Sequence, residues 1–315
     1  MQKNISQVQT KPADVGQMIS SGQKDFLLQN FKNHFHEKVS SFKILKELLS
    51  YILNENGVTG IRFMYGIQDL AKPETCLVLM PCSENMASPK SNLPNIMIQE
   101  DGYFLHTGVQ VPLEETWKIL FNHVKHEHTL NPEQNIKTIH RGDFWGVNKL
   151  NTFINNPETD TLQFNLGYSP TEGEFSKGIH PVLEAFDAEN KNLNIWMDFT
   201  SPCPQMCDGG DGLCISTKIV DTLFKNNDET ELNILRSFRE DLWQTENGHL
   251  VEMYYHSSPV IVSAINKHEN KEEIYKDLYG NYLKPCLQAI EDGNNPQVLK
   301  LYNEVFAHLN DKYSS

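Results

Sequence analysis

Three cysteines in the middle of the chain have the spacing of a metal site. Cys203 and Cys207 are separated by three residues, and the glycine-rich run that follows could fold Cys214 back toward them. Closely spaced thiolates are common zinc ligands, and a structural zinc has four ligands, so an aspartate of this run, a distant histidine or a second chain would complete the set. The segment 201–214 is therefore either a zinc-stabilised link or a flexible linker with incidental cysteines.

Cys214 also has the position of a reactive thiol. It stands directly before Ile215-Ser-Thr-Lys-Ile-Val, a predicted helix start, where backbone N–H groups and the helix dipole lower the pKa of a thiol. A nucleophilic cysteine needs a base, and His249 and His256 are the nearest candidates along the sequence. The alternative is a cysteine that packs as a small apolar side chain.

A histidine cluster lies near the end of another predicted helix. On a helix, His123, His126 and Glu127 fall within one arc, which makes capture of a divalent metal geometrically possible. Leu130-Asn-Pro ends the helix shortly afterwards, and histidines near a helix C-terminus interact favourably with its free carbonyls. We take this simpler account and expect the histidines in an exposed last turn.

The segment from Leu232 to Ile265 has the most specific residue pattern in the chain. Apolar residues at three- and four-residue spacing predict an amphipathic helix with one buried stripe. The stripe consists of Leu232, Leu235, Phe238 and Leu242. Asn247-Gly248 is a helix stop, because both residues tolerate the left-handed conformation. A second helix is predicted over 250–255, and Pro259 fits the first turn of a third over 260–265.

Two short motifs in this segment resemble a known bacterial module. Leu235-Arg-Ser-Phe-Arg-Glu-Asp and Tyr254-Tyr-His-Ser-Ser-Pro are similar to the LRxFRD and YYxxSP elements of the C-terminal helical module of proteins that carry a CFI-box. In that family a cysteine precedes the module, and Cys214 has the corresponding place, although Ile215-Ser-Thr replaces the aromatic and aliphatic residues that the family favours there. The resemblance implies a helical C-terminal domain and no known activity.

Two arginines and two tyrosines of the same segment have two interpretations. Arg236, Arg239, Tyr254 and Tyr255 either belong to ordinary helical faces, as packing residues and solvated charges, or form a recognition surface for a partner. We expect Arg236, Arg239 and Tyr255 to be at least partly exposed.

The first two thirds of the chain contain an internal repeat. Each copy is predicted to run helix, helix, strand, loop, strand, with Phe63 matching Phe164 and Gly66 matching Gly167. The run Gly60-Ile-Arg-Phe-Met-Tyr-Gly, with the apolar strand after it, also resembles uncharacterised proteins of Bacteroidota-type bacteria over about Met18 to Cys207, which implies no known activity.

The predicted fold class is α+β, with two tandem small units followed by an all-helical domain. The helix before each strand pair is predicted from Phe42 to Ile52 and from Phe144 to Ile154. The expected divisions are a disordered N-terminus over 1–17, repeat units over 18–110 and 111–200, a linker over 201–214 and a helical domain over 215–315.

Composition sets the outer limits of function. The 315 residues carry a net charge of −14, which argues against nucleic acid or an anionic membrane surface as the main partner. The polar start of the chain has no secretory signal, and no apolar run reaches the ~18–20 residues of a membrane helix. Six cysteines without an export signal are expected to be thiols, so the predicted location is cytoplasmic.

The sequence favours an interaction protein over an enzyme. It contains no triad order, phosphate-binding loop, dinucleotide fingerprint or zincin motif. We expect a bacterial interaction, scaffold or assembly protein with a protein partner or self-association, no nucleic acid or membrane partner, and no cofactor, although zinc remains possible. The alternatives are a cysteine-dependent enzyme or modification substrate centred on Cys214, and a zinc-stabilised structural protein.

Overall fold

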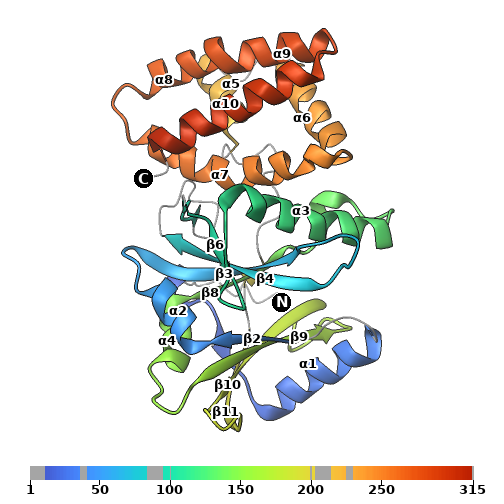
Figure 1. Ribbon diagram of the computed structural model, residues 1–315, viewed down its shortest axis with the longest axis vertical. Helices are drawn as coiled ribbons and strands as arrows, with labels where there is room; N and C mark the ends of the chain where they lie inside the picture. Colours follow the sequence, from blue (N-terminus) through green and yellow to red (C-terminus); the bar gives the residue numbers. More distant parts are fainter. Residues whose placement is uncertain are drawn as a thin grey trace, which may run out of the picture.

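Two antiparallel sheets and a helical domain make up the protein, as the fold class predicted. The computed structural model describes residues 11–35, 41–83, 95–99, 101–198, 201–202, 214–224 and 230–313. Figure 1 shows the helical domain above helix α3, with one sheet below that helix and the second sheet below the first. The α+β class with a C-terminal helical region is therefore confirmed.

The first sheet, sheet A, has five strands in the order β1-β11-β10-β9-β2. Their bounds are Gln17–Met18, Asn192–Asp198, Gly178–Phe186, Thr161–Ser169 and Ser41–Leu45. Helix α1 (Ser21–His34) covers its outer face, where Leu27 packs with Val182.

The second sheet, sheet B, has the order β12-β8-β3-β4-β6-β7, and β5 pairs with β4. The bounds from β12 to β7 are Ser201–Pro202, Gly142–Gly146, Val58–Ile67, Thr75–Ser83, Tyr103–Leu105 and Gln110–Val111, and β5 is Asn95–Ile96. Helix α3 (Leu113–Leu130) covers the face of sheet B that looks toward the helical domain, where Ile119 and Leu120 join the core (Figure 1).

Strands β2 and β8 are exchanged between the two halves of the chain. Strand β2 pairs with β9 of the second half, with Phe42 opposite Phe164, whereas β8 pairs with β3 of the first half, with Asp143 opposite Phe63. Each half otherwise repeats strand, helix, strand, strand, the helices being α2 (Lys46–Leu53) and α4 (Val147–Ile154). Each sheet therefore contains strands from both sides of the boundary that we predicted at residue 110, so this boundary does not separate one sheet from the other.

Part of each predicted helix is a strand. The helices expected over 42–52 and 144–154 begin only at Lys46 and Val147, after β2 and β8. In β2, Phe42 and Ile44 are buried and alternate with exposed Lys43, which is a strand period that pairing with β9 stabilises. Short apolar runs are ambiguous between helix and strand until their pairing partner is known.

The main core lies between the sheets. The rings of Phe63 and Phe164 stack there with their centroids 5.6 Å apart, and both residues are fully buried. The matched glycines lie on the outer faces, where helices approach closely. A Cβ atom on Gly66 would lie 2.4 Å from Ile119, and one on Gly167 would lie 2.8 Å from the Cβ of Leu27. Both glycines are thus explained by helix–sheet packing.

Residues 11–17 have a defined structure, in contrast to the disordered stretch expected over 1–17. A 3₁₀ turn, η1 (Pro12–Asp14), precedes β1, and Val15 is buried. The Val15 carbonyl accepts a hydrogen bond from Gly146, and Asp14 accepts one from Asn148. These contacts with the second half of the chain cannot be recognised from the polar composition of the segment. Residues 1–10 lie outside the described ranges.

Six α-helices within the described residues form the C-terminal domain. They are α5 (Ile215–Phe224), α6 (Thr230–Trp243), α7 (His249–Asn266), α8 (Lys271–Leu278), α9 (Lys284–Glu291) and α10 (Asn295–Tyr313), with a 3₁₀ turn η3 (Glu246–Gly248) and a π-helical turn η4 (Tyr279–Leu283). Helix α7 runs through Pro259, so the separate helices expected over 250–255 and 260–265 are one helix. Pro259 has no backbone N–H and cannot make the usual helical hydrogen bond. The packing of α7 against both α3 and the core of the domain stabilises the helix despite this loss.

A buried ion pair joins the helical domain to the sheets. Arg141, just before β8, donates from Nε and Nη2 to the two carboxylate oxygens of Glu252 on α7, both at 3.1 Å. The side chain of Glu252 is fully buried and that of Arg141 is 3% exposed. Burial raises the pKa of Glu252, but the Arg141 charge and the hydrogen bonds with His256 and Arg141 together lower it further, to about 2. His256 lies 3.6 Å from the same carboxylate and stacks on Trp117 of α3.

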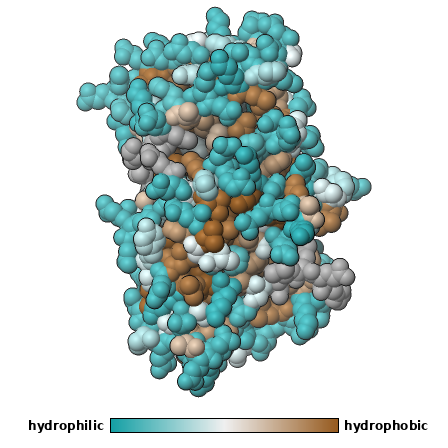
Figure 2. All heavy atoms as spheres, in the orientation of Figure 1, coloured by the Kyte–Doolittle hydropathy of each residue, from teal (hydrophilic) through white to brown (hydrophobic). Residues whose placement is uncertain are grey.

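The apolar side of helix α10 faces the core of the helical domain. On the face in Figure 2, hydrophobic residues gather at mid-height, and the end formed by the helical domain is mainly hydrophilic. Phe306 and Leu309 of α10 are buried in the domain core. Helix α10 therefore packs as part of the helical domain. No helix in the described ranges combines the length and the hydropathy that crossing a bilayer requires.

Candidate functional site

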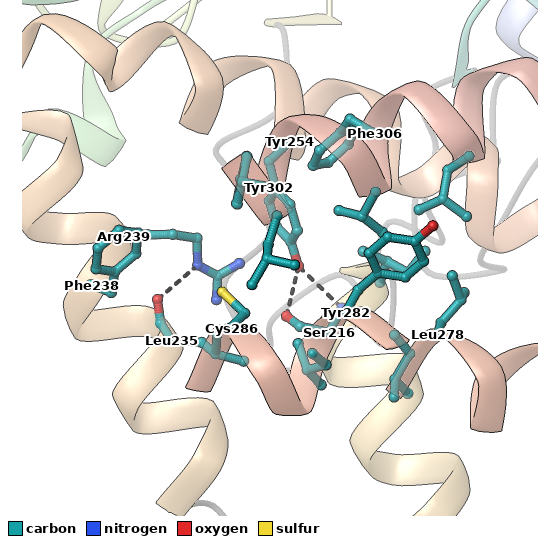
Figure 3. Close-up of a pocket in the computed structure, with 16 residues that line it drawn as sticks. Ser216, Leu235, Phe238, Arg239, Tyr254, Leu278, Tyr282, Cys286, Tyr302 and Phe306 are labelled. Atoms are coloured by element: carbon teal, nitrogen blue, oxygen red, sulfur yellow. Dashed lines mark hydrogen bonds between the residues drawn. The ribbon is translucent and has the colours of Figure 1, made fainter. Parts of the chain in front are cut away.

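A small hollow lies inside the helical domain. Its volume is about 70 Å³, and helices α5 to α10 and the turn η4 all contribute to its wall. Figure 3 shows the lining side chains pointing inward from these helices. The apolar part of the wall consists of Ile215, Ile219, Leu235, Phe238, Leu278, Leu283, Leu301, Val305, Phe306 and Leu309.

Arg239 brings a charge into this apolar wall. On α6 the buried positions are Leu232, Leu235, Arg239, Leu242 and Trp243, so the arginine occupies a position in the hydrophobic stripe. Only 5% of Arg239 is exposed. The expected stripe residue Phe238 is partly buried at the edge of the core. The spacing of position 239 from Leu235 and Leu242 is the signal in the sequence that could have identified Arg239 as an interior group.

The guanidinium of Arg239 uses only part of its hydrogen-bonding capacity among the described residues. Its Nε donates to the Leu235 carbonyl at 3.2 Å, and its central carbon lies 4.6 Å from the ring centroid of Tyr254 and 5.5 Å from that of Tyr255. Its Nη1 is buried and has no hydrogen-bond partner among the described residues. Since a guanidinium stays protonated in proteins, a positive charge with an unused donor lies beside the hollow.

The polar groups around Arg239 are neutral donors and acceptors. The Tyr254 hydroxyl lies 2.7 Å from Ser216 Oγ and accepts a hydrogen bond from the Ser216 backbone N–H (Figure 3). The Tyr302 hydroxyl is buried without a partner among the described residues. Burial raises the pKa of both phenols although the Arg239 charge lowers it, and burial raises the pKa of the Cys286 thiol to about 11. The described wall therefore suits binding better than proton transfer.

The exposure expected for Arg239 and Tyr255 is wrong. Arg239, Tyr254 and Tyr255 are all buried, and Arg236 is half-buried and donates to Asn233. We expected Arg236, Arg239 and Tyr255 to be at least partly exposed, because arginine and tyrosine usually keep their polar ends in water. Cation–π contacts with two tyrosines instead hold the Arg239 charge inside.

Cys214 directly precedes α5, as predicted, and belongs to the core of the helical domain. The two candidate bases are engaged elsewhere. His249 is bonded to the Glu246 carbonyl at 3.1 Å, and His256 is held between Glu252 and Trp117. Both histidines therefore have other partners in the structure.

The predicted zinc site cannot be followed to its ligands. Cys203 and Cys207 lie outside the described residues, and only Cys214 of the three is placed. Within the described ranges, no group of three or more histidine, cysteine, aspartate or glutamate side chains has a metal-binding arrangement.

A second polar cluster, missed by sequence reasoning, lies between the sheets. The Tyr65 hydroxyl donates to Asp143 Oδ2 at 3.0 Å, and His140 Nε2 lies 2.8 Å from the same oxygen. His123 Nε2 lies 3.0 Å from the His140 carbonyl, and both imidazoles line a cavity of about 150 Å³. His123 is thus buried, which corrects the exposed last turn expected for it. Asp143 within the fully buried strand β8 was the available signal.

The pKa values of the two imidazoles in this cluster are shifted in opposite directions. Burial lowers the pKa of His140, but the Asp143 carboxylate raises it more, so the net pKa lies above the ordinary value. Burial lowers the pKa of His123 to about 4. Asp143 thus has two hydrogen-bonding partners, His140 and the Tyr65 hydroxyl, and these contacts link the segment before β8 to strand β3.

Comparison with known proteins adds no relative. The chain matches no protein-family model, no curated protein and no solved structure.

Proposed function

We propose that this chain is a non-enzymatic interaction protein whose helical domain binds an acceptor group of a ligand or partner in the Arg239 hollow. The observation that carries the proposal is the buried guanidinium with an unused Nη1 donor beside an apolar space. An unpaired buried charge costs several kcal/mol, and cation–π contacts return only about 2 kcal/mol when desolvated. An incoming acceptor would remove the remaining cost.

The chemistry of the wall favours binding over catalysis. The tyrosine and cysteine side chains beside Arg239 have raised pKa values and stay neutral at pH 7. A general acid or base works best with a pKa near the operating pH. In this proposal, the two sheets form the rigid scaffold to which the buried Arg141–Glu252 pair attaches the binding domain.

Hydrogen exchange on the full chain tests the proposal. An extract of the host cells is separated into a low-molecular-weight and a macromolecular fraction, and each is added to the wild type and to Arg239→Met. We expect one fraction to slow amide exchange in α5, α6 and α10 of the wild type, and to lose this effect with Arg239→Met. Arg236→Met, the same change on the same helix, serves as the control and should behave as the wild type. Absence of protection by both fractions would refute the proposal.

A further inference from the structure

We infer that the cavity lined by His123 and His140 binds a small quaternary ammonium cation. This cavity shares no described lining residue with the Arg239 hollow, and the inference does not rest on the proposed function. It depends on three properties of the cavity, namely its aromatic wall, the charge of its lining and its volume.

Aromatic rings from three parts of the chain line the cavity. Phe31 of α1 and Phe35, directly after that helix, lie with their ring centroids 4.8 Å apart. The ring of Tyr65 on β3 lies 5.5 Å from the imidazole of His123 and 5.5 Å from that of His140. The faces of phenyl and phenol rings attract cations within ~6 Å of their centroids, and groups of such rings form the cages that receive quaternary ammonium ligands. The wall therefore favours a cation.

The charge of the lining has the opposite sign to such a ligand. Glu127 of α3 contributes a carboxylate, and the described lining contains no lysine or arginine. His140 is bonded to Asp143, so a proton on this imidazole is balanced by its own partner. Burial lowers the pKa of His123 to about 4, which keeps this imidazole neutral at pH 7. The cavity therefore attracts a cation and repels an anion.

The volume and the apolar part of the wall select a methylated cation. The cavity has about 150 Å³, the size that takes up benzene, and a trimethylammonium group has fewer non-hydrogen atoms than benzene. Ile139, Leu166 and Ile179 also line the cavity. A primary ammonium would bring N–H donors against these side chains, where they would stay unpaired, whereas a trimethylammonium group has none. The His140 side chain is 30% exposed, so the cavity is open to solvent on this side.

Choline is the probe that tests this inference. Its methyl protons are followed by NMR during titration with the full chain, in competition with its neutral isostere dimethylbutanol and with ethanolamine, its unmethylated counterpart. We expect saturable binding of choline and at least ~10-fold weaker binding of both competitors, because one lacks the charge and the other keeps its N–H donors. Equal binding of the neutral isostere, or no saturable binding of choline up to ~10 mM, would overturn the inference.

Four variants separate recognition from folding. Glu127→Gln removes the charge but keeps the shape of the side chain, so choline should bind several-fold more weakly while the neutral isostere binds as before. Phe35→Leu, at a half-buried position, should reduce the preference for choline over the isostere in the same way. Glu115→Gln, the same change in the first turn of α3, is the control and should bind choline as the wild type does. Arg239→Met should do so as well, because its hollow is a separate site. Full preference for choline in both Glu127→Gln and Phe35→Leu would show that choline binds elsewhere, and the assignment would fail.

Discussion

Removal of the Glu252 charge tests how firmly the helical domain is fixed to the sheets. In Glu252→Gln the side chain keeps its shape, but the guanidinium of Arg141 loses its counter-charge in an interior where it is 3% exposed. Arg141 keeps its bonds to the Ile139 and Ile136 carbonyls, which accept hydrogen bonds but carry no net charge. The substitution thus removes the charge of the contact and replaces one of its two acceptor oxygens by an amide N–H donor, which faces an Arg141 donor.

The expected loss is large for a single substitution. The pKa of Glu252 falls from an ordinary value of 4.5 to about 2. Since one pKa unit corresponds to about 1.4 kcal/mol, the ionised form contributes roughly 3 kcal/mol to stability at neutral pH. Breaking a buried pair by removing one partner costs a similar ~3–5 kcal/mol. Glu272→Gln, an exposed carboxylate on α8, is the matched control and should change stability by less than about 0.5 kcal/mol.

The pH dependence gives a second readout with a fixed sign. The pKa of Glu252 is lower in the folded chain than in the unfolded chain, so its contribution is complete above pH 4.5 and is lost as the pH falls through about 2. In urea unfolding, the free-energy difference between wild type and Glu252→Gln should be constant from neutral pH down to about 5 and shrink below that.

Two results would refute this reasoning. One is a loss below about 1 kcal/mol at pH 7, which would mean that water or a neighbouring group replaces the carboxylate. The other is a double variant, Arg141→Met with Glu252→Leu, that is as unstable as Glu252→Gln, because an apolar pair of similar volume should recover most of the loss.

Three further predictions concern packing, protonation and thiol reactivity. Gly167→Ala should cost about 1–3 kcal/mol in denaturant unfolding, because its Cβ would clash with α1, whereas Gly22→Ala, with nothing within 4 Å, should cost none. The pKa of His123 is about 4 in the folded chain and 6.5 ordinarily, so between these pH values the unfolded chain binds a proton that the folded chain does not. The free energy of unfolding should therefore fall as the pH drops from 6.5 to 4, and the His123→Gln variant should lack this fall. Cys214 is buried, so mass spectrometry should find it alkylated no faster than buried Cys76 in the native chain; much faster alkylation would favour the cysteine-dependent alternative.

Much of the local structure could be predicted from residue periodicity. The stripe of α6, the start of α5 and the strands around Phe63 and Phe164 follow from spacing and from glycine positions. The exchange of β2 and β8 could not, because the sequence of a strand does not specify which distant strand it pairs with. A short strand that leads directly into a helix therefore resembles a part of that helix in the sequence, as β2 does before α2.

The burial of Arg239 in the candidate site could not be predicted, for a different reason. Sequence reasoning assigns an arginine to the solvent, since a buried charge without a partner is unfavourable. Arg239 departs from this rule because Tyr254 and Tyr255 on α7 face it, and that contact depends on how two helices pack. The departure of a residue from the usual preference is itself a feature typical of functional sites.

The exchange of β2 and β8 has a consequence for how the chain is made. Until residues 161–165 leave the ribosome, β2 has no partner, and until residues 142–146 do, one edge of β3 is open. Such open edges can pair with other chains. Neither half can therefore mature as an independent domain during translation, and a polypeptide truncated between the halves would present unpaired strands to its neighbours. The nascent first half thus depends on the second to be shielded from aggregation.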